Sequence, residues 1–276
     1  MTSANDHDES DVELDRFLES VYQRFHYDFR HYSRSFLRRR VNQAASSLGS
    51  PSIAHLLDRV VRDPGALAEL LHQLTIQVSD FFRDPGYYRA LRERVVPHLA
   101  TYPSLRIWVA GCGAGEEAYS IAILLREAGL LERTLIYATD IDARSLQTAQ
   151  AGVYDLERVR GFSENYFSAG GRASLSEYFS TASTRAVVDA TLRKRILFSD
   201  HSLATDAAFS EVQLVSCRNV LIYFDNELQD RAVGLFRDSL CPRGFLGLGS
   251  KERLTFSSHA PAFESLADDE RIYRAK

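Results

Sequence analysis

Cysteine, excess charge and long apolar runs are all scarce in this sequence of 276 residues. Its three cysteines are scattered, without a paired framework or a C-x-x-C, so neither a disulfide scaffold nor a zinc site is indicated. No apolar run reaches the roughly 18 residues that a membrane-spanning helix needs, and the acidic N-terminus is unlike a signal peptide. We therefore expect a cytoplasmic protein without a metal centre and without membrane insertion.

The charge balance argues against a further class of protein. The formal net charge is −4, which disfavours an electrostatic grip of the whole protein on nucleic acid. One segment departs from this average: in residues 24–40, "RFHYDFRHYSRSFLRRR", arginines are interleaved with aromatics, and Asp28 is the one acid. Otherwise the chain is 45% hydrophobic and 25% charged, the balance of an ordinary globular protein.

Helical spacing of apolar residues runs from residue 12 to about residue 76. Val12, Phe17 and Val21 recur at near-helical intervals, and Pro64 suits the first turn of a later helix. We predict an all-helical domain over residues 1–80, with about four helices. A further helix should then follow "SDFFRDPGYY" (residues 79–88) and run to Pro97.

Strands and helices alternate from Leu105 onwards, where strands are predicted at 105–110, 134–140, 212–217 and 244–250. This alternation predicts an α/β fold with a parallel sheet, helices on both faces, and a ligand site at the carboxyl ends of the strands. Residues 162–198 break the alternation and are predicted to form one helix and short strands. They would be an inserted β excursion within a domain of residues 81–276.

The stretch "GCGAGEE" joins the first predicted strand to a helix. Gly111, Gly113 and Gly115 allow positive φ and leave no Cβ in the way of a ligand. Their spacing is G-x-G-x-G rather than the dinucleotide fingerprint G-x-G-x-x-G, and Glu116 and Glu117 would repel a pyrophosphate. S-adenosylmethionine has a sulfonium, an ammonium and no phosphate, so an acidic loop suits it better. Either glutamate is a candidate to face the ammonium, and the other would cap the helix.

Polar residues also follow two other predicted strands. Asp140 ends "YATD" and is expected to accept hydrogen bonds from ribose hydroxyls. In "SCRNVLIYFD", Arg218 and Asn219 come directly after a strand, and Tyr223 follows. Tyr223 alone would be an ordinary boundary aromatic, but its place at the ligand edge favours a catalytic role. No N-P-P-Y sequence occurs, which argues against methylation of exocyclic amines on nucleic acid bases.

These motifs together resemble the CheR family of bacterial chemotaxis receptor methyltransferases. The likeness covers nearly the whole chain, and "GEEAYSIA" followed about 100 residues later by "CRNVLIYF" is its most specific part. It implies a Rossmann-like methyltransferase domain that uses S-adenosylmethionine, an N-terminal helical domain, and a small antiparallel β subdomain at about residues 162–198. It also implies that the protein methylates glutamate side chains of chemoreceptors and forms S-adenosylhomocysteine.

The resemblance also assigns residues to the donor. It implies contacts from the junction between the domains and from two strand ends, namely Gln77, Ser79, Arg83, Ser202, Leu203, Arg218, Asn219 and Val220. The family usually has Asn and Thr at the positions of Gln77 and Ser79, and Asn at that of Ser202. The first two substitutions preserve hydrogen-bonding capacity, whereas the third weakens the expected contact on the adenine side.

A glutamate substrate needs no general base. A glutamate side chain in water has a pKa of about 4.3, so the carboxylate is itself the nucleophile at neutral pH, and the enzyme has to align it and exclude water. Tyr223 is the candidate for orienting it, and Arg83 for a bidentate contact with the donor's carboxylate. The arginine-rich helical face would dock the glutamate-rich helices of a receptor. A receptor C-terminal peptide at the β subdomain is left open.

Two other functions are compatible with the same fold. One is a methyltransferase for a small molecule or nucleic acid, which would act without any receptor. The other is a non-catalytic module that binds S-adenosylmethionine and serves as a signalling scaffold. Transfer of methyl groups to receptor glutamates would distinguish a receptor methyltransferase from both of these alternatives.

Overall fold

The computed structural model describes residues 3–75 and 79–276. In the first of these ranges four helices form the N-terminal domain, and they are α1 (Ser3–Phe25), α2 (Arg34–Ser47), α3 (Ile53–Arg62) and α4 (Pro64–Leu74). Side chains of Ser52 and Asp63 accept hydrogen bonds from backbone N–H groups at the starts of α3 and α4, which fixes both helix ends. The expected helical domain is therefore present, with its own apolar core.

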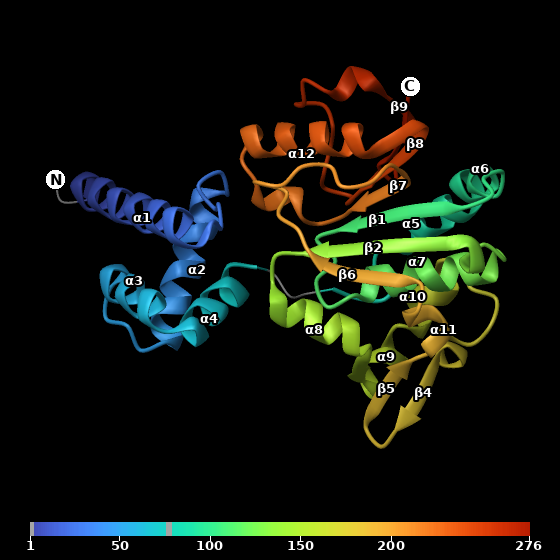
Figure 1. Cartoon of the computed structure of the whole chain (residues 1–276), viewed down its shortest axis with the longest axis horizontal. Helices are drawn as coiled ribbons and strands as arrows, with labels where there is room; N and C mark the ends of the chain where they lie inside the picture. The colour runs from blue at the N-terminus through green and yellow to red at the C-terminus, as the bar shows by residue number, and fades with distance from the viewer. Residues whose placement is uncertain (1–2, 76–78) are drawn as a thin grey trace.

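A mixed sheet forms the centre of the second domain (Figure 1). Its strands, in spatial order, are β6 (Ile196–Asp200), β2 (Thr134–Asp140), β1 (Leu105–Ala110), β7 (Val212–Cys217), β8 (Leu240–Leu248), β10 (Ile272–Ala275) and β9 (Phe263–Ala267). The prediction of a parallel sheet is correct from β6 to β8. It is wrong at the other edge, where β10 runs antiparallel to both of its neighbours. These last strands are too short for their pattern to stand out in the sequence.

Helices cover both faces of this sheet. One face carries α5 (Pro85–Ala90), a π-helical turn (Leu91–Val95), α6 (Val96–Leu99), α7 (Glu116–Glu127) and α8 (Ala143–Ala151), and the other carries α12 (Asn226–Ser239). Alternate residues of β1 enter the two cores, because Ile107 packs under α7 while Trp108 packs against Phe236 of α12. The predicted helices after β1, β2 and β7 are all present.

A small antiparallel sheet is inserted between β2 and β6. It contains β3 (Val153–Asp155), β5 (Arg185–Val188) and β4 (Phe179–Ala182), with α9 (Leu156–Gly161), α10 (Ser163–Ser168) and α11 (Ala190–Arg193) around it. Its position differs from the predicted 162–198 at both ends. Strand β3 comes earlier in the chain, and residues 196–198 belong to β6 of the main sheet. Three residues are too few to show a strand period, which explains why β3 is not apparent from the sequence.

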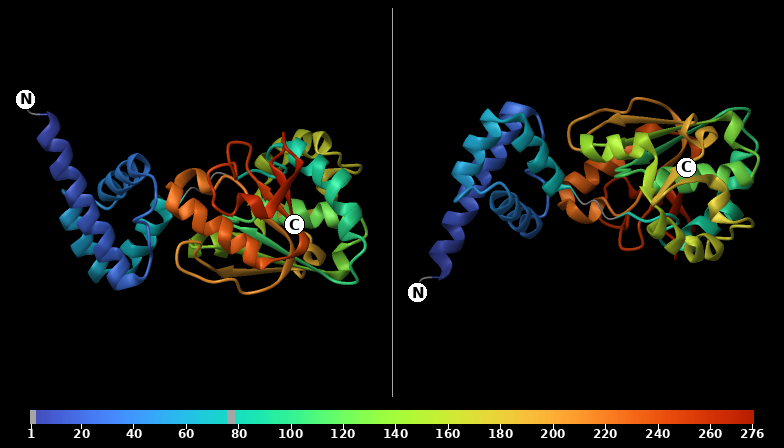
Figure 2. Two further views of the ribbon diagram at one scale, coloured as in Figure 1. Left: turned by 90° about the horizontal axis from the view of Figure 1, so that it is seen from above. Right: turned by 90° about the horizontal axis from the view of Figure 1, so that it is seen from below.

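The N-terminal domain lies off the carboxyl ends of the parallel strands (Figures 1 and 2). His72 of α4 reaches the Asp142 carboxylate at 2.9 Å, and Arg144 of α8 reaches Glu69 at 2.6 Å. Tyr32 forms an isolated antiparallel bridge with Phe224. The edge of the sheet at which ligands are expected therefore faces the helical domain. Among the described residues, no helix is both long enough and apolar enough to cross a membrane.

Candidate active site

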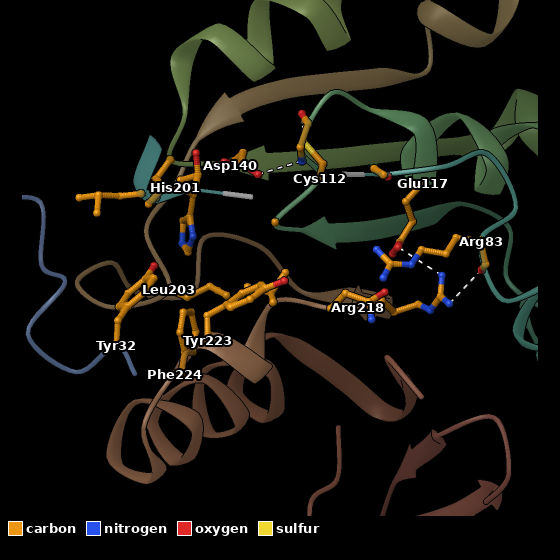
Figure 3. Close-up of a pocket in the computed structure, with 18 of the residues that line it drawn as sticks. Tyr32, Arg83, Cys112, Glu117, Asp140, His201, Leu203, Arg218, Tyr223 and Phe224 are labelled. Carbon is orange, nitrogen blue, oxygen red and sulfur yellow. Dashed lines mark hydrogen bonds and ion pairs between the residues drawn. The ribbon is translucent and has the colours of Figure 1, made fainter. Parts of the chain in front are cut away.

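A pocket opens at the carboxyl ends of the central strands and is closed on its other side by the helical domain (Figure 3). The main domain contributes Asp80, Arg83, Gly111, Cys112, Gly113, Glu117, Asp140, Ile141, His201, Leu203, Arg218, Asn219, Val220, Tyr223 and Phe224 to its lining. The helical domain and the junction contribute Tyr32, Phe36, Leu74, Thr75 and Ser79. The pocket therefore joins most of the predicted site residues with side chains of the separate helical domain earlier in the chain.

The three glycines of the loop after β1 have three different surroundings. All have positive φ, at 70°, 53° and 94° for Gly111, Gly113 and Gly115. A Cβ on Gly111 would lie 2.4 Å from the Val220 side chain, and one on Gly115 would lie 2.9 Å from Ala149. A Cβ on Gly113 would meet nothing within 4 Å. Gly113 is thus the glycine that leaves open space for a ligand, whereas Gly111 and Gly115 permit close packing within the protein.

The two glutamates after this loop point to different places. Glu117 lines the pocket, and its Oε1 accepts a 2.7 Å hydrogen bond from the Ser216 hydroxyl. Glu116 is fully buried and is not part of the lining; its carboxylate lies 3.1 Å from the Arg158 guanidinium. Burial raises the pKa of Glu116 to about 7, and Arg158 acts in the opposite direction. Glu117 is therefore the carboxylate available to a ligand in the pocket.

Arg218 is a buried cation that contacts Glu117 in the wall of the pocket. Its side chain is 1% exposed and lies over the Tyr87 ring, 4.2 Å from the centroid. It donates to the Arg83 carbonyl at 2.9 Å and to the Asp84 carboxylate at 2.8 Å, and its Nη1 lies 3.4 Å from Glu117. These contacts make it a residue that positions Glu117 and the start of the second domain.

Asp140 sits at the tip of β2, as expected. Its carboxylate accepts hydrogen bonds from the backbone N–H of Gly113 at 2.8 Å and of Asp142 at 3.0 Å, one on each oxygen. A carboxylate oxygen has two acceptor sites, so these two hydrogen bonds do not exhaust the capacity of the carboxylate. Burial raises the pKa of Asp140, and backbone N–H groups, among them those of Asp142 and Gly113, oppose this rise. The side chain ties the glycine loop to β2 while keeping acceptor capacity for a ligand.

The loop after β6 agrees only in part with the sequence. Leu203 lines the pocket, whereas Ser202 is not part of the lining; its hydroxyl accepts a hydrogen bond from the Ala204 N–H at 3.3 Å within its own turn. A contact of Ser202 with the donor stays a prediction. The neighbouring His201, which the sequence analysis does not single out, lines the pocket and packs against the ring of Trp108. The signal in the sequence that could have indicated His201 as a site residue is its position directly after the end of a strand.

Two residues of the helical domain contact Tyr223 and hold it in place. Its ring lies 4.9 Å from that of Phe36, and its carbonyl accepts a hydrogen bond from the Ser33 N–H at 2.7 Å. Burial raises the pKa of Tyr223, whereas the positive charges of Arg83 and Arg40 lower it. Figure 3 shows Tyr223 in the middle of the pocket, between Leu203 and Arg218. The first domain is therefore part of the site and not only an attachment to it.

The junction contributes Ser79 and Arg83 to the pocket. The Ser79 carbonyl accepts a hydrogen bond from Arg158 of α9, so the inserted subdomain also touches this segment. Gln77, the third junction residue expected to bind the donor, lies outside the described residues. No cluster of three potential metal ligands occurs in residues 3–75 and 79–276.

Comparison with known proteins identifies the family. Residues 77–271 match the family described as CheR methyltransferase, SAM binding domain, and residues 12–75 match CheR methyltransferase, all-alpha domain. The chain is 52% identical over 265 residues to the putative methyltransferase Cher3 of Pseudomonas putida, which covers 96% of this chain and 97% of that protein.

Two further relatives differ in length. Chemotaxis protein methyltransferase 1 of Pseudomonas aeruginosa is 32% identical over 231 residues, 78% of this chain and 80% of that protein. An uncharacterized 104.1 kDa protein of Rhodobacter capsulatus is 31% identical over 270 residues, 95% of this chain but 27% of that protein. The resemblance found in the sequence is confirmed: this chain belongs to the CheR methyltransferase family and carries its S-adenosylmethionine-binding domain.

Proposed function

We propose that this protein transfers the methyl group of S-adenosylmethionine to glutamate side chains of chemoreceptors, forming glutamyl methyl esters and S-adenosylhomocysteine. The pocket is the observation that carries this proposal. Its acidic wall comes from the glycine loop and β2, and its opposite wall, with Tyr223, is completed by the helical domain. The similarity to a chemotaxis protein methyltransferase of Pseudomonas aeruginosa supports the same pathway.

The residues in the pocket fit the donor. In this proposal Glu117 pairs with the ammonium group, because it is the glutamate that reaches the pocket. Arg83 pairs with the donor's carboxylate, and Asp140 accepts from the ribose hydroxyls with the acceptor sites that its two backbone contacts leave over. Leu203 and the apolar rings beside it cover the adenine. Glu116 and Ser202 lie outside the pocket lining and have no donor contact in this proposal. Arg218 lines the pocket, and its side chain acts through Glu117, which it holds in place.

The chemistry needs alignment more than acid or base catalysis. The donor supplies an electrophilic methyl group on a positively charged sulfur. A glutamate carboxylate oxygen forms the new C–O bond as the S–C bond breaks, and the electron pair of that bond stays on sulfur. A tyrosine hydroxyl keeps its proton at neutral pH, and burial raises the pKa of Tyr223 further, so its hydroxyl is available to orient the carboxylate. Phe36 and Leu203 exclude water from the reacting groups.

The receptor is proposed to dock at the C-terminal part of the arginine-rich segment. Arg34 and Arg38 of α2 form ion pairs with Asp15 and Asp11 of α1. Arg39 is exposed, and both Arg39 and Arg40 are close enough to Tyr223 for their charges to lower the pKa of its hydroxyl. An acidic helix that meets this pair would therefore bring its glutamates to the mouth of the pocket.

Neutralising the two pairs of arginines separately tests this docking site. We expect Arg39→Gln with Arg40→Gln to raise the KM for receptor about tenfold at low salt, and to flatten its dependence on ionic strength, because surface attraction is screened by salt. Arg34→Gln with Arg38→Gln removes the same charge from the same helix and should change KM less than threefold, because these charges already face acids of α1. Equal effects of the two double variants would contradict the assignment.

The glycine loop offers a second test. We expect Gly113→Ala to weaken S-adenosylhomocysteine binding about tenfold in calorimetry, because its Cβ would enter the open pocket, while a φ of 53° costs about 1–2 kcal/mol in stability. Gly111→Ala should lower the melting temperature more, since its Cβ would collide with Val220 and overpacking adds about 1–3 kcal/mol. Normal donor binding by Gly113→Ala would show that the loop does not face the donor.

The proposed reaction is tested directly with labelled donor. The protein is incubated with S-adenosylmethionine labelled in the methyl group and with membranes that contain receptors from the same cell. Base-labile methyl esters on receptor glutamates are the expected product. Donor binding without such esters would instead indicate a non-catalytic module, and methylation of a small molecule without receptor would indicate the other alternative. Binding of a receptor C-terminal peptide at the β subdomain stays open.

A further inference from the structure

A buried carboxylate that the sequence analysis does not single out lies beneath the loop that carries Tyr223. Glu252 is 3% exposed and follows β8. Its two oxygens accept four backbone N–H hydrogen bonds: Oε2 from Asn219 at 3.0 Å and Gly249 at 2.5 Å, and Oε1 from Val220 at 2.9 Å and Ile222 at 3.3 Å. Three of the four donors belong to the pocket loop after β7.

The topology of the sheet explains why Glu252 lies within hydrogen-bonding distance of the loop after β7. Strands β7 and β8 are parallel neighbours, with Cys217 opposite Leu248, so the segments that follow them leave the sheet side by side. The loop after β7 ends in a 3-10 turn (Leu221–Tyr223), whose own hydrogen bonds begin at the Tyr223 N–H. The N–H groups of residues 219–222 come before that point, and Asn219 has a φ of 62°, outside the helical region. Buried N–H groups need acceptors, and Glu252 supplies them from the neighbouring segment. The approach is tight enough to exclude a side chain at Gly249, whose Cβ would lie 2.7 Å from the Glu252 carboxylate.

The loop that Glu252 holds connects the two sides of the pocket. Val220 packs against the glycine loop, so closely that a Cβ on Gly111 would collide with it. Tyr223 follows after three residues and meets Phe36 of the helical domain. A shift of this loop would therefore displace the donor side and the tyrosine hydroxyl together. Errors of about 1 Å in the placement of reacting groups are enough to cost about 100-fold in rate.

We propose that Glu252 is a positioning residue for methyl transfer: its carboxylate sets the backbone of residues 219–222, and through it the position of Tyr223 over the donor. This inference rests on the proposed function and adds to it a residue that touches neither substrate. We expect the substitution of Glu252 by Gln to weaken its hold on the loop in part. Gln in place of Glu keeps the volume and one acceptor oxygen but turns an NH2 group toward N–H donors, so about half of the contacts are lost.

Glu252→Gln, Tyr223→Phe and the double variant are compared in single-turnover transfer to receptor, with calorimetry for donor affinity and melting curves for folding. We expect Glu252→Gln to slow transfer at least tenfold while it melts cooperatively and changes the KM for receptor less than threefold. At saturating donor, where a change in donor affinity no longer affects the rate, the double variant should be little slower than Tyr223→Phe alone, because both changes then act on the same hydroxyl. Glu264→Gln, at an exposed site on β9, is the matched control and should transfer like the wild type.

The possible results separate this inference from the proposed function. A wild-type rate in Glu252→Gln overturns the inference, and so do effects that multiply in the double variant, because a purely structural loss is independent of Tyr223. If the unaltered protein methylates no receptor, the proposed function fails. The donor affinity of Glu252→Gln, compared with that of the wild type, then tests whether Glu252 holds the loop. A fivefold or greater weakening by Glu252→Gln would support its hold on the loop, whereas unchanged affinity would refute it.

Discussion

Glu117→Gln is expected to weaken the binding of S-adenosylmethionine about 100-fold, because it removes a buried anion from its cationic partner, and breaking such pairs costs several kcal/mol. The substitution keeps the size of the side chain and its hydrogen bond from Ser216, so the loss reports charge. Arg218 keeps Asp84 and the Arg83 carbonyl as partners, which limits the damage to the fold. Isothermal titration calorimetry with S-adenosylmethionine measures the effect.

The adjacent glutamate is the matched control for this experiment. Glu116→Gln makes the same chemical change one residue earlier, at a carboxylate that faces Arg158 and not the pocket. Its donor affinity should stay within about threefold of the wild type. Because burial raises the pKa of Glu116 to about 7, the ionised form is disfavoured in the fold, so Glu116→Gln should not lose stability at pH 8. If Glu116→Gln loses the donor and Glu117→Gln keeps it, the assignment of the two glutamates is reversed.

Binding should also depend on pH in a defined direction. Burial raises the pKa of Glu117, and Arg218 with Ser216 opposes that rise. A raised pKa means that Glu117 takes up its proton at a higher pH than an exposed glutamate does. On acidification, donor affinity should therefore begin to fall above the ordinary range of glutamate, and Glu117→Gln should remove this part of the pH dependence. The prediction is checked by titrations over a series of pH values.

The features that the sequence predicts well depend on local signals. The apolar strand Leu105–Ala110 is followed by the glycine loop and the strand Thr134–Asp140 ends in a carboxylate, and these two ends meet at one edge because the strands are parallel. That rule alone brings Asp140 to the glycine loop, where it accepts from Gly113. Local patterns also predict the four helices of the first domain, whose apolar positions recur at helical spacing.

The features that the sequence misses are long-range contacts. Phe36 and Tyr32 belong to the apolar pattern of a different domain, and nothing in their spacing indicates that they close the pocket. Glu252 follows a strand like many surface acids, and only the pairing of β7 with β8 brings its carboxylate beneath the loop at Asn219. The choice between Glu116 and Glu117 likewise depends on helix orientation. Such features depend on the packing of elements, which periodicity does not encode.

Tyr223→Phe is expected to slow methyl transfer about 100-fold at saturating donor and receptor, the range found when one oriented hydrogen-bond donor is removed from an active site. The ring should stay in place, because its contact with Phe36 at 4.9 Å and the hydrogen bond from the Ser33 N–H to its carbonyl do not involve the hydroxyl. Donor affinity should therefore remain within about threefold of the wild type. Single-turnover transfer to receptor and calorimetry with the donor measure the two quantities separately.

A tyrosine in the central sheet, away from the pocket, controls for the loss of a hydroxyl as such. Tyr137 of β2 is half-buried and packs on the ring of Phe209, outside the pocket lining, so Tyr137→Phe should transfer at the wild-type rate. An undiminished rate in Tyr223→Phe would mean that alignment comes from Arg83 and the receptor itself. The pocket would then act only by holding the donor, since an ionised glutamate needs no proton removed before it attacks.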